Sequence, residues 1–150
     1  MHKLSKALAD LVHELHRGLS HTGLPLEFFE MVLQRLFMFR YKIVKEDSYA
    51  LRFAVLIADQ KVRTYCNIIT IPKEVLPKLA DISVGIFLEE KLQNGQLNLG
   101  DLDLSSVVAV KEGDTSVTFG ASASDKISAL FCGMTSVESG ELSCYRKLKW

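Results

Sequence analysis

The first part of the chain carries apolar residues at helical spacing. A leucine stripe recurs at steps of four, three and four residues: Leu4, Leu8, Leu11 and Leu15. This spacing places the four side chains along one side of an α-helix, and Gly18 is a natural end for that helix. Pro25 suits the first position of a second helix over residues 26–35, which is apolar on nearly every side. The pattern therefore predicts two helices before residue 37.

From residue 37 onward the pattern changes, because apolar and polar residues alternate. Alternation is typical of half-buried β-strands. Polar breaks interrupt it at residues 46–48 and 59–60. We interpret residues 37–71 as a three-stranded antiparallel meander. Its apolar face, which packs under the helices, consists of Phe37, Phe39, Tyr41, Phe53 and Val55.

The rest of the chain mixes helical and strand patterns. Residues 75–86 return to helical spacing, and Asn94-Gly95 ends that helix. Beyond it the pattern predicts a hairpin, a short helix stopped by Gly133, and a final strand, over residues 106–119, 124–132 and 141–149. The predicted fold class is therefore α+β: a mainly antiparallel sheet, built from the meander and a C-terminal hairpin and strand, with helices packed on one face.

Length and charge limit the classes of protein to which the chain can belong. Its 150 residues are typical of one domain, and we expect residues 1–150 to fold as a unit. With 18 basic and 18 acidic residues the net charge is zero, which gives no reason to expect nucleic acid as a partner. No uncharged apolar run is long enough to cross a bilayer, and no signal peptide is visible, so we expect no membrane association.

The cysteines and histidines do not form a recognisable metal or disulfide pattern. Cys66, Cys132 and Cys144 are an odd set without zinc-site spacing, which favours a reducing compartment and a cytoplasmic protein. His13 and His16 share a face of the first predicted helix, but nothing in the sequence supplies an obvious third ligand. We interpret them as surface histidines and expect no metal site.

Sequence motifs for catalysis are absent or incomplete. The run 120–124 resembles the G-x-S-x-G elbow of hydrolases but lacks the final glycine. Gly18 and Gly23 have the spacing of a phosphate-binding loop, yet Leu24-Pro25 stands where that loop has Lys-Ser/Thr. A cysteine nucleophile that meets a histidine in space stays open, with Cys132 as the candidate. We assign no catalytic residue and no cofactor from the sequence.

The outer face of the predicted meander is the candidate functional site. With the register set by the two polar breaks, this face gathers six ligand-binding candidates: Arg40, Lys42, Arg52, Arg63, Tyr65 and Asn67. Like charges opposite each other on a sheet are unfavourable unless an anion neutralises them. Arginine offers paired donors for carboxylate or phosphate, and Ala50, Ala54 and Ala58 leave room above the sheet. The alternative is a solvated face, or one paired with acids such as Asp101 and Asp103.

These observations favour a non-catalytic binding module. We expect a protein partner or a small anionic ligand on the sheet face. We also expect a homo-oligomer, because a helix as short as the second one rarely covers apolar residues on both sides with its own core. The second hypothesis is a small enzyme with an unrecognised active site. A deep pocket with perturbed polar groups would favour the enzyme, and a broad, shallow surface would favour the binding module.

Overall fold

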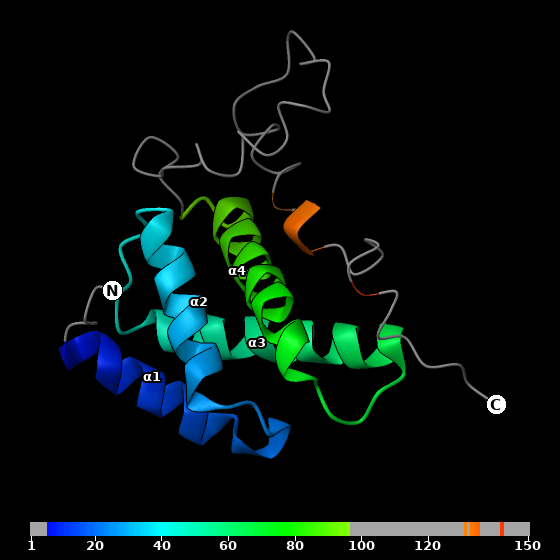
Figure 1. The fold of residues 1–150 in the computed structure, drawn as a ribbon. Helices are drawn as coiled ribbons and strands as arrows, with labels where there is room; N and C mark the ends of the chain where they lie inside the picture. The colour runs from blue at the N-terminus through cyan, green and yellow to red at the C-terminus, as the bar shows by residue number, and fades with distance from the viewer. Residues whose placement is uncertain (1–5, 97–130, 132, 136–141, 143–150) are drawn as a thin grey trace, which may run out of the picture.

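The described part of the protein consists of helices. The computed structural model describes residues 6–96, 131, 133–135 and 142, and these contain no strand. Four main helices form the fold: α1 (Lys6–Gly18), α2 (Leu26–Met38), α3 (Asp47–Cys66) and α4 (Leu76–Gln93). Figure 1 shows α2 and α4 standing side by side, with α3 crossing behind them and α1 below. The predicted α+β class with a mainly antiparallel sheet is therefore wrong.

The first two helices are found where the sequence predicts them. The leucine stripe of α1 faces the interior, where Leu11 and Leu15 are buried. Pro25 directly precedes α2, with extended backbone, and a short 3₁₀ turn, η1 (Ser20–Thr22), separates the two helices. The predicted end of α2 near residue 35 is three residues early, because the helix continues to Met38.

The apolar character of α2 has a cause within the chain. Five of its large side chains are completely buried: Phe28, Phe29, Val32, Leu33 and Leu36. The helix contacts α1 on one side and α4 on another, so the fold itself covers more than one of its faces. The fold therefore covers these residues itself, while Phe37 and Met38 at the end of the helix stay exposed, and the homo-oligomer remains a prediction.

The predicted meander is replaced mainly by one long helix, α3. Its buried residues recur at three- and four-residue steps rather than at alternate positions: Asp47, Leu51, Ala54, Val55, Ala58, Val62 and Cys66. The alternating apolar residues do not share one buried face. Leu51 and Val55 are buried, whereas Tyr49 is 76% exposed and Phe53 is 60% exposed. A helical period thus describes the burial, and the period of two does not.

A physical reason for the helix lies in the residues that were interpreted as sheet features. Ala50, Ala54 and Ala58 recur every four residues, and alanine is the strongest helix former. Asp59 was interpreted as part of a turn, but it lies within α3 and pairs with Arg63 one turn later. The polar break at residues 46–48 is the start of α3, where an acidic residue is favoured by the helix dipole.

The helix predicted around residues 75–86 is confirmed as α4. A 3₁₀ turn, η2 (Lys73–Val75), leads into it, and Pro77 occupies its first turn, where a missing backbone donor costs nothing. Residues 133–135 are helical, so Gly133 does not end a helix. The predicted hairpin over 106–119 lies outside the described residues, as does nearly all of the predicted final strand.

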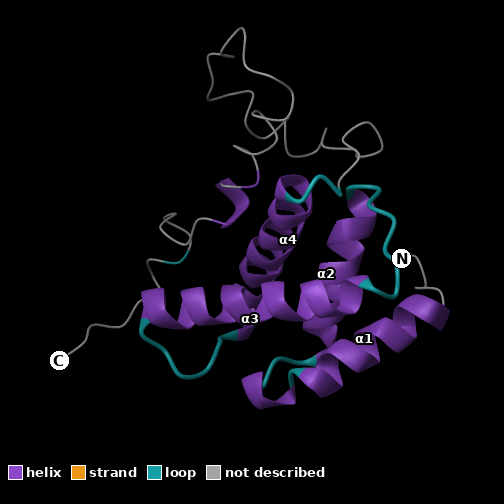
Figure 2. Ribbon diagram, turned by 180° about the vertical axis from the view of Figure 1, so that it is seen from behind, coloured by secondary structure: helices purple, strands orange, loops and turns teal. Residues whose placement is uncertain are grey.

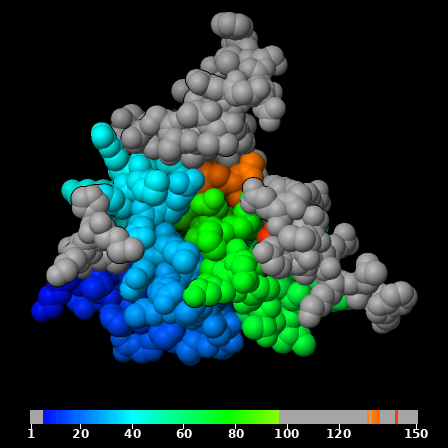
Figure 3. Space-filling model, viewed as in Figure 1, coloured from blue at the N-terminus to red at the C-terminus, as the bar shows by residue number. Residues whose placement is uncertain are grey.

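Gly85 lets the short helical segment at residues 131–135 approach α4 closely. A β-carbon at Gly85 would lie 2.9 Å from Met134 Cβ and 3.3 Å from the carbonyl oxygen of Phe131. Figure 3 shows the segment, in orange, against the green surface of α4. Phe131 is fully buried and Met134 is 9% exposed, so this contact completes the described core.

Substitution of Gly85 by a larger residue should therefore destabilise the folded state. We expect Gly85→Leu to lower the free energy of unfolding by about 2–3 kcal/mol, because overpacking forces the segment at 131–135 away from α4. Gln93→Leu is the matched control, since it adds a leucine at an exposed position of the same helix. Urea unfolding of both variants measures the difference. Equal stability of the two would show that residues 131–135 do not pack on α4.

Candidate functional site

The six predicted ligand-binding residues do not share the face of a sheet. Arg52, Arg63 and Tyr65 lie on α3, and Asn67 ends that helix. Arg40 and Lys42 precede α3, in the link after α2. The alternation that was expected to unite these residues does not exist, because the chain is helical between residues 47 and 66.

Arg63 is a structural residue that ties α3 to two neighbouring loops. Its Nε lies 2.9 Å from both carboxylate oxygens of Asp59. The guanidinium also donates to the carbonyl oxygen of Thr22, at 2.6 Å, and to that of Ile69. Asp59 is only 8% exposed, so its charge is compensated by Arg63. Arg63 lines a cavity of about 470 Å³ between η1 and residues 69–76, but each of its guanidinium nitrogens already donates to the protein.

Arg40 and Asn67 have backbone roles at helix ends. Both adopt the left-handed conformation, with φ of 59° and 54°. After Arg40 the amide of Tyr41 donates to the carbonyl of Leu36, and Asn67 donates to the carbonyl of Arg63, as helix-ending residues do. The sequence signal for these two ends is weak, because glycine is the usual residue at such positions and neither end has one.

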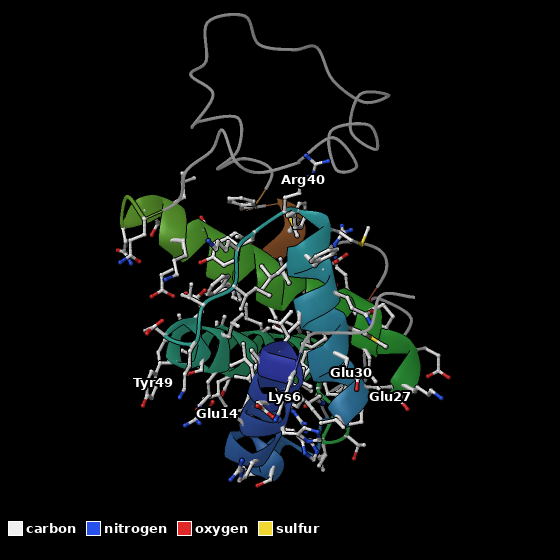
Figure 4. All side chains as sticks on the ribbon, turned by 90° about the vertical axis from the view of Figure 1, so that its left-hand side faces the viewer. Lys6, Glu14, Glu27, Glu30, Arg40 and Tyr49 are labelled. Carbon is white, nitrogen blue, oxygen red and sulfur yellow. The ribbon has the colours of Figure 1, made fainter. Side chains whose placement is uncertain are left out.

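Arg52 is the predicted residue that faces an open groove. The groove lies between α1 and the start of α3 and has a volume of about 580 Å³. Its lining is mostly charged: Asp10, His13, Glu14, Arg17, Gly18, Lys45 and Arg52. Figure 2 shows the side of the molecule on which α1 and α3 run next to each other. In Figure 4 the labelled Glu14 of α1 and Tyr49 of α3 project on the same side of the ribbon.

The Arg52 side chain reaches across this groove to the end of α1. A β-carbon at Gly18 would lie 2.5 Å from Arg52 Nη2 and 2.6 Å from Cζ, so the guanidinium lies on the glycine. The Nε of Arg52 is buried and has no hydrogen-bond partner among the residues that the structure describes. A cation near the C-terminal end of a helix is favoured by the helix dipole. Gly18 therefore both ends α1 and makes room for Arg52.

The charges around the groove are not paired with one another. Ion pairs elsewhere in the described chain link Arg35 to Asp81, Arg63 to Asp59 and Lys91 to Asp47, with N–O distances of 2.9–3.1 Å. No ion pair recorded among the described residues involves a charged group of the groove. Three cations, Arg17, Lys45 and Arg52, thus border the groove without an ion pair to another described residue.

A second polar cluster, centred on Asp47, is buried and structural. Asp47 is 1% exposed; its Oδ2 accepts from the Tyr41 hydroxyl and the Val44 amide at 3.1 Å, and its Oδ1 lies 3.1 Å from Lys91 Nζ. The ring of Tyr41 packs edge-on against Phe87. Desolvation raises the pKa of Tyr41, and the neighbouring Asp47 charge raises it further. The cluster joins the start of α3 to the end of α4, and sequence reasoning missed it.

The histidines and Cys66 do not converge on a site. His16 packs edge-on against Phe29, with ring centroids 5.9 Å apart, whereas His13 is exposed on the groove side of α1. Cys66 is fully buried in the core. Within the described residues no group of three or more histidine, cysteine, aspartate or glutamate side chains is arranged to hold a metal ion. Cys132 and Cys144 lie outside that part of the chain.

Comparison with protein-family models, curated proteins and solved structures finds no match to this chain. None of the described helices combines the length and the hydropathy needed to pass through a bilayer. The candidate site is therefore defined by its own geometry: the groove between α1 and α3, with Arg52 at one end.

Proposed function

We propose that this protein is a non-catalytic binding module that holds a carboxylate or a similar anion in the groove between α1 and α3. Arg52 is the main donor, and Arg17 and Lys45 supply further positive charge. The observation that carries the proposal is the Arg52 guanidinium, which lies beside Gly18 with a buried Nε that has no hydrogen-bond partner among the described residues. A desolvated donor without a partner is costly, and an anion in the groove would relieve that cost.

Gly18 supports the proposal because it explains how the cation is held. The guanidinium lies on the bare backbone of Gly18, and any larger residue would displace it. An arginine positioned in this way has lost side-chain freedom before the ligand arrives, which favours binding. The mixed charge of the groove matters as well. Asp10 and Glu14 border the same space, so an anion is best accommodated at the end formed by Arg17 and Arg52.

The alternative of a small enzyme has no supporting observation in the described residues. Tyr41, whose pKa is raised by burial and by Asp47, has its hydroxyl engaged with Asp47 in a packed cluster away from the groove. The groove is open and shallow, which is typical of a surface that binds a partner rather than of a site that encloses a substrate.

Citrate binding provides the test, because this tricarboxylate can use several donors at once. We expect Arg52→Gln to weaken citrate binding about tenfold or more, since a hydrogen bond to a charged group is lost, and to reduce the salt dependence of binding. Isothermal titration calorimetry at two salt concentrations measures both quantities. The matched control is Lys61→Gln, which removes an exposed cation from the same helix outside the groove. Equal losses in the two variants would contradict the proposal.

A further inference from the structure

The outer face of α1 carries charges in an order that complements itself. The four residues of α1 that line the groove with charged or imidazole side chains are Asp10, His13, Glu14 and Arg17. If a second copy of α1 lies antiparallel, with its centre between residues 13 and 14, Asp10 meets Arg17 and His13 meets Glu14. Both pairs are complementary, and each occurs twice because the arrangement is symmetric.

The start of α3 is also complementary to an antiparallel copy of itself, with Tyr49 at the centre. An antiparallel copy centred there places Glu46 opposite Arg52 and Lys45 opposite Phe53. Glu46 and Lys45 are exposed, and a lysine over an aromatic ring is a favourable contact. Tyr49 meets Tyr49 of the second copy at the centre. Tyr49 and Phe53 are the largest exposed apolar side chains of α3, at 76% and 60% exposure.

Both centres lie between the two ends of the groove. Lys45 lines the groove near Asp10 and Glu14, and Arg52 lies on Gly18 at the other end. Both helices therefore pass along the groove in the same order, from Asp10 and Lys45 at one end to Gly18 and Arg52 at the other. A two-fold axis that lies between the two copies, over both helices and across them, brings both sets of complementary pairs together.

We propose that the groove between α1 and α3 binds a second copy of this chain through that two-fold axis. The inference rests on the proposed function, because the carboxylates that bind to Arg52 and Arg17 are then those of Glu46 and Asp10 of the second copy. An aromatic centre at Tyr49 and Phe53 with a charged rim is the anatomy of a protein–protein interface. The zero net charge of the chain adds no long-range repulsion between copies.

A charge exchange on α1 tests the two-fold pairing. Asp10→Arg and Arg17→Glu each place like charges opposite one another twice, and each is expected to raise the dissociation constant of the dimer at least about tenfold. An equimolar mixture of the two variants should restore the dimer, because the new cation of one variant then faces the new anion of the other. Sedimentation equilibrium from low micromolar to submillimolar concentration measures all three samples and the wild type.

A wild-type chain that stays monomeric, or a mixture that associates no more tightly than either variant alone, would overturn the dimer. Circular dichroism checks that each variant keeps its helices. If either α1 variant does not fold, Glu46→Arg mixed with Arg52→Glu makes the same exchange on α3. Citrate binding to the neutral variant Tyr49→Ser, which removes the central contact, separates the two proposals. If citrate binds but the wild type does not dimerise, the proposed function stands and the dimer is overturned. If the wild type dimerises but citrate does not bind, only the proposed function is overturned.

Discussion

Replacement of Asp47 by alanine is expected to lower the free energy of unfolding by about 3–5 kcal/mol, the range found when one member of a buried ion pair is removed. The carboxylate is almost completely buried and accepts hydrogen bonds from Tyr41 and the Val44 amide while it pairs with Lys91. Without it these three groups lose their partner in a poorly hydrated environment, which is the costly case. Urea unfolding followed by circular dichroism measures the change.

The control for Asp47→Ala is Glu90→Ala, which removes an exposed acid next to Lys91 on α4. We expect that change to stay within about 0.5 kcal/mol, as exposed substitutions usually do. A similar small effect for Asp47→Ala would mean that the cluster is hydrated and does not join α3 to α4.

Titration of Tyr41 gives a second measurement of the same cluster. The folded state holds the pKa of Tyr41 above its ordinary value, chiefly through desolvation and also through Asp47. As pH rises above about 10, the unfolded chain loses this proton before the folded chain does. Stability contributed by Tyr41 is therefore complete below that pH and falls above it. Asp47→Ala should bring the ultraviolet titration of this tyrosine closer to the ordinary value.

The first two helices were predicted because the sequence marks where one stops and where the other begins. The leucine stripe of α1 stops at Gly18, and α2 begins directly after Pro25. In α3 the apolar residues satisfy two periods, because Leu51 and Val55 belong both to the alternating set and to the helical set. Tertiary contacts decide between the periods, since α4 packs on α3 and the side chains of Ala54 and Ala58 are completely buried. Alanines at four-residue steps were the available helical signal.

The candidate site was predicted in part and for a reason that the structure corrects. Arg52 was selected because arginine binds anions well, and the structure places it in a groove. That groove lies between α1 and α3 and not between neighbouring strands. Arg17 and Lys45 were not selected, because their proximity to Arg52 depends on how α1 and α3 cross. Arg63 was selected for its charge, although its partners include the carbonyl of Thr22, far away in the sequence.

Arg63 and Arg52 lie about three turns apart on α3, and we expect replacement by alanine to change stability much more at Arg63 than at Arg52. Arg63→Ala should lower the free energy of unfolding by about 3 kcal/mol, because the nearly buried Asp59 loses its counter-charge and two loop carbonyls lose their donor. Arg52→Ala should change it by less than about 1 kcal/mol, since no hydrogen bond or ion pair among the described residues is lost and a buried unpaired donor is removed.

Urea unfolding of the two variants at one protein concentration decides whether the assignment of roles is correct. The double variant Asp59→Asn/Arg63→Ala sharpens the comparison, because it removes the buried charge together with its partner. We expect it to be more stable than Arg63→Ala alone, as the unpaired carboxylate is the main source of the loss. If Arg52→Ala proves the more destabilising single change, Arg52 is a structural residue and the groove loses its proposed anion donor. If neither change matters, the contacts of Arg63 with Thr22 and Ile69 do not hold the loops in solution.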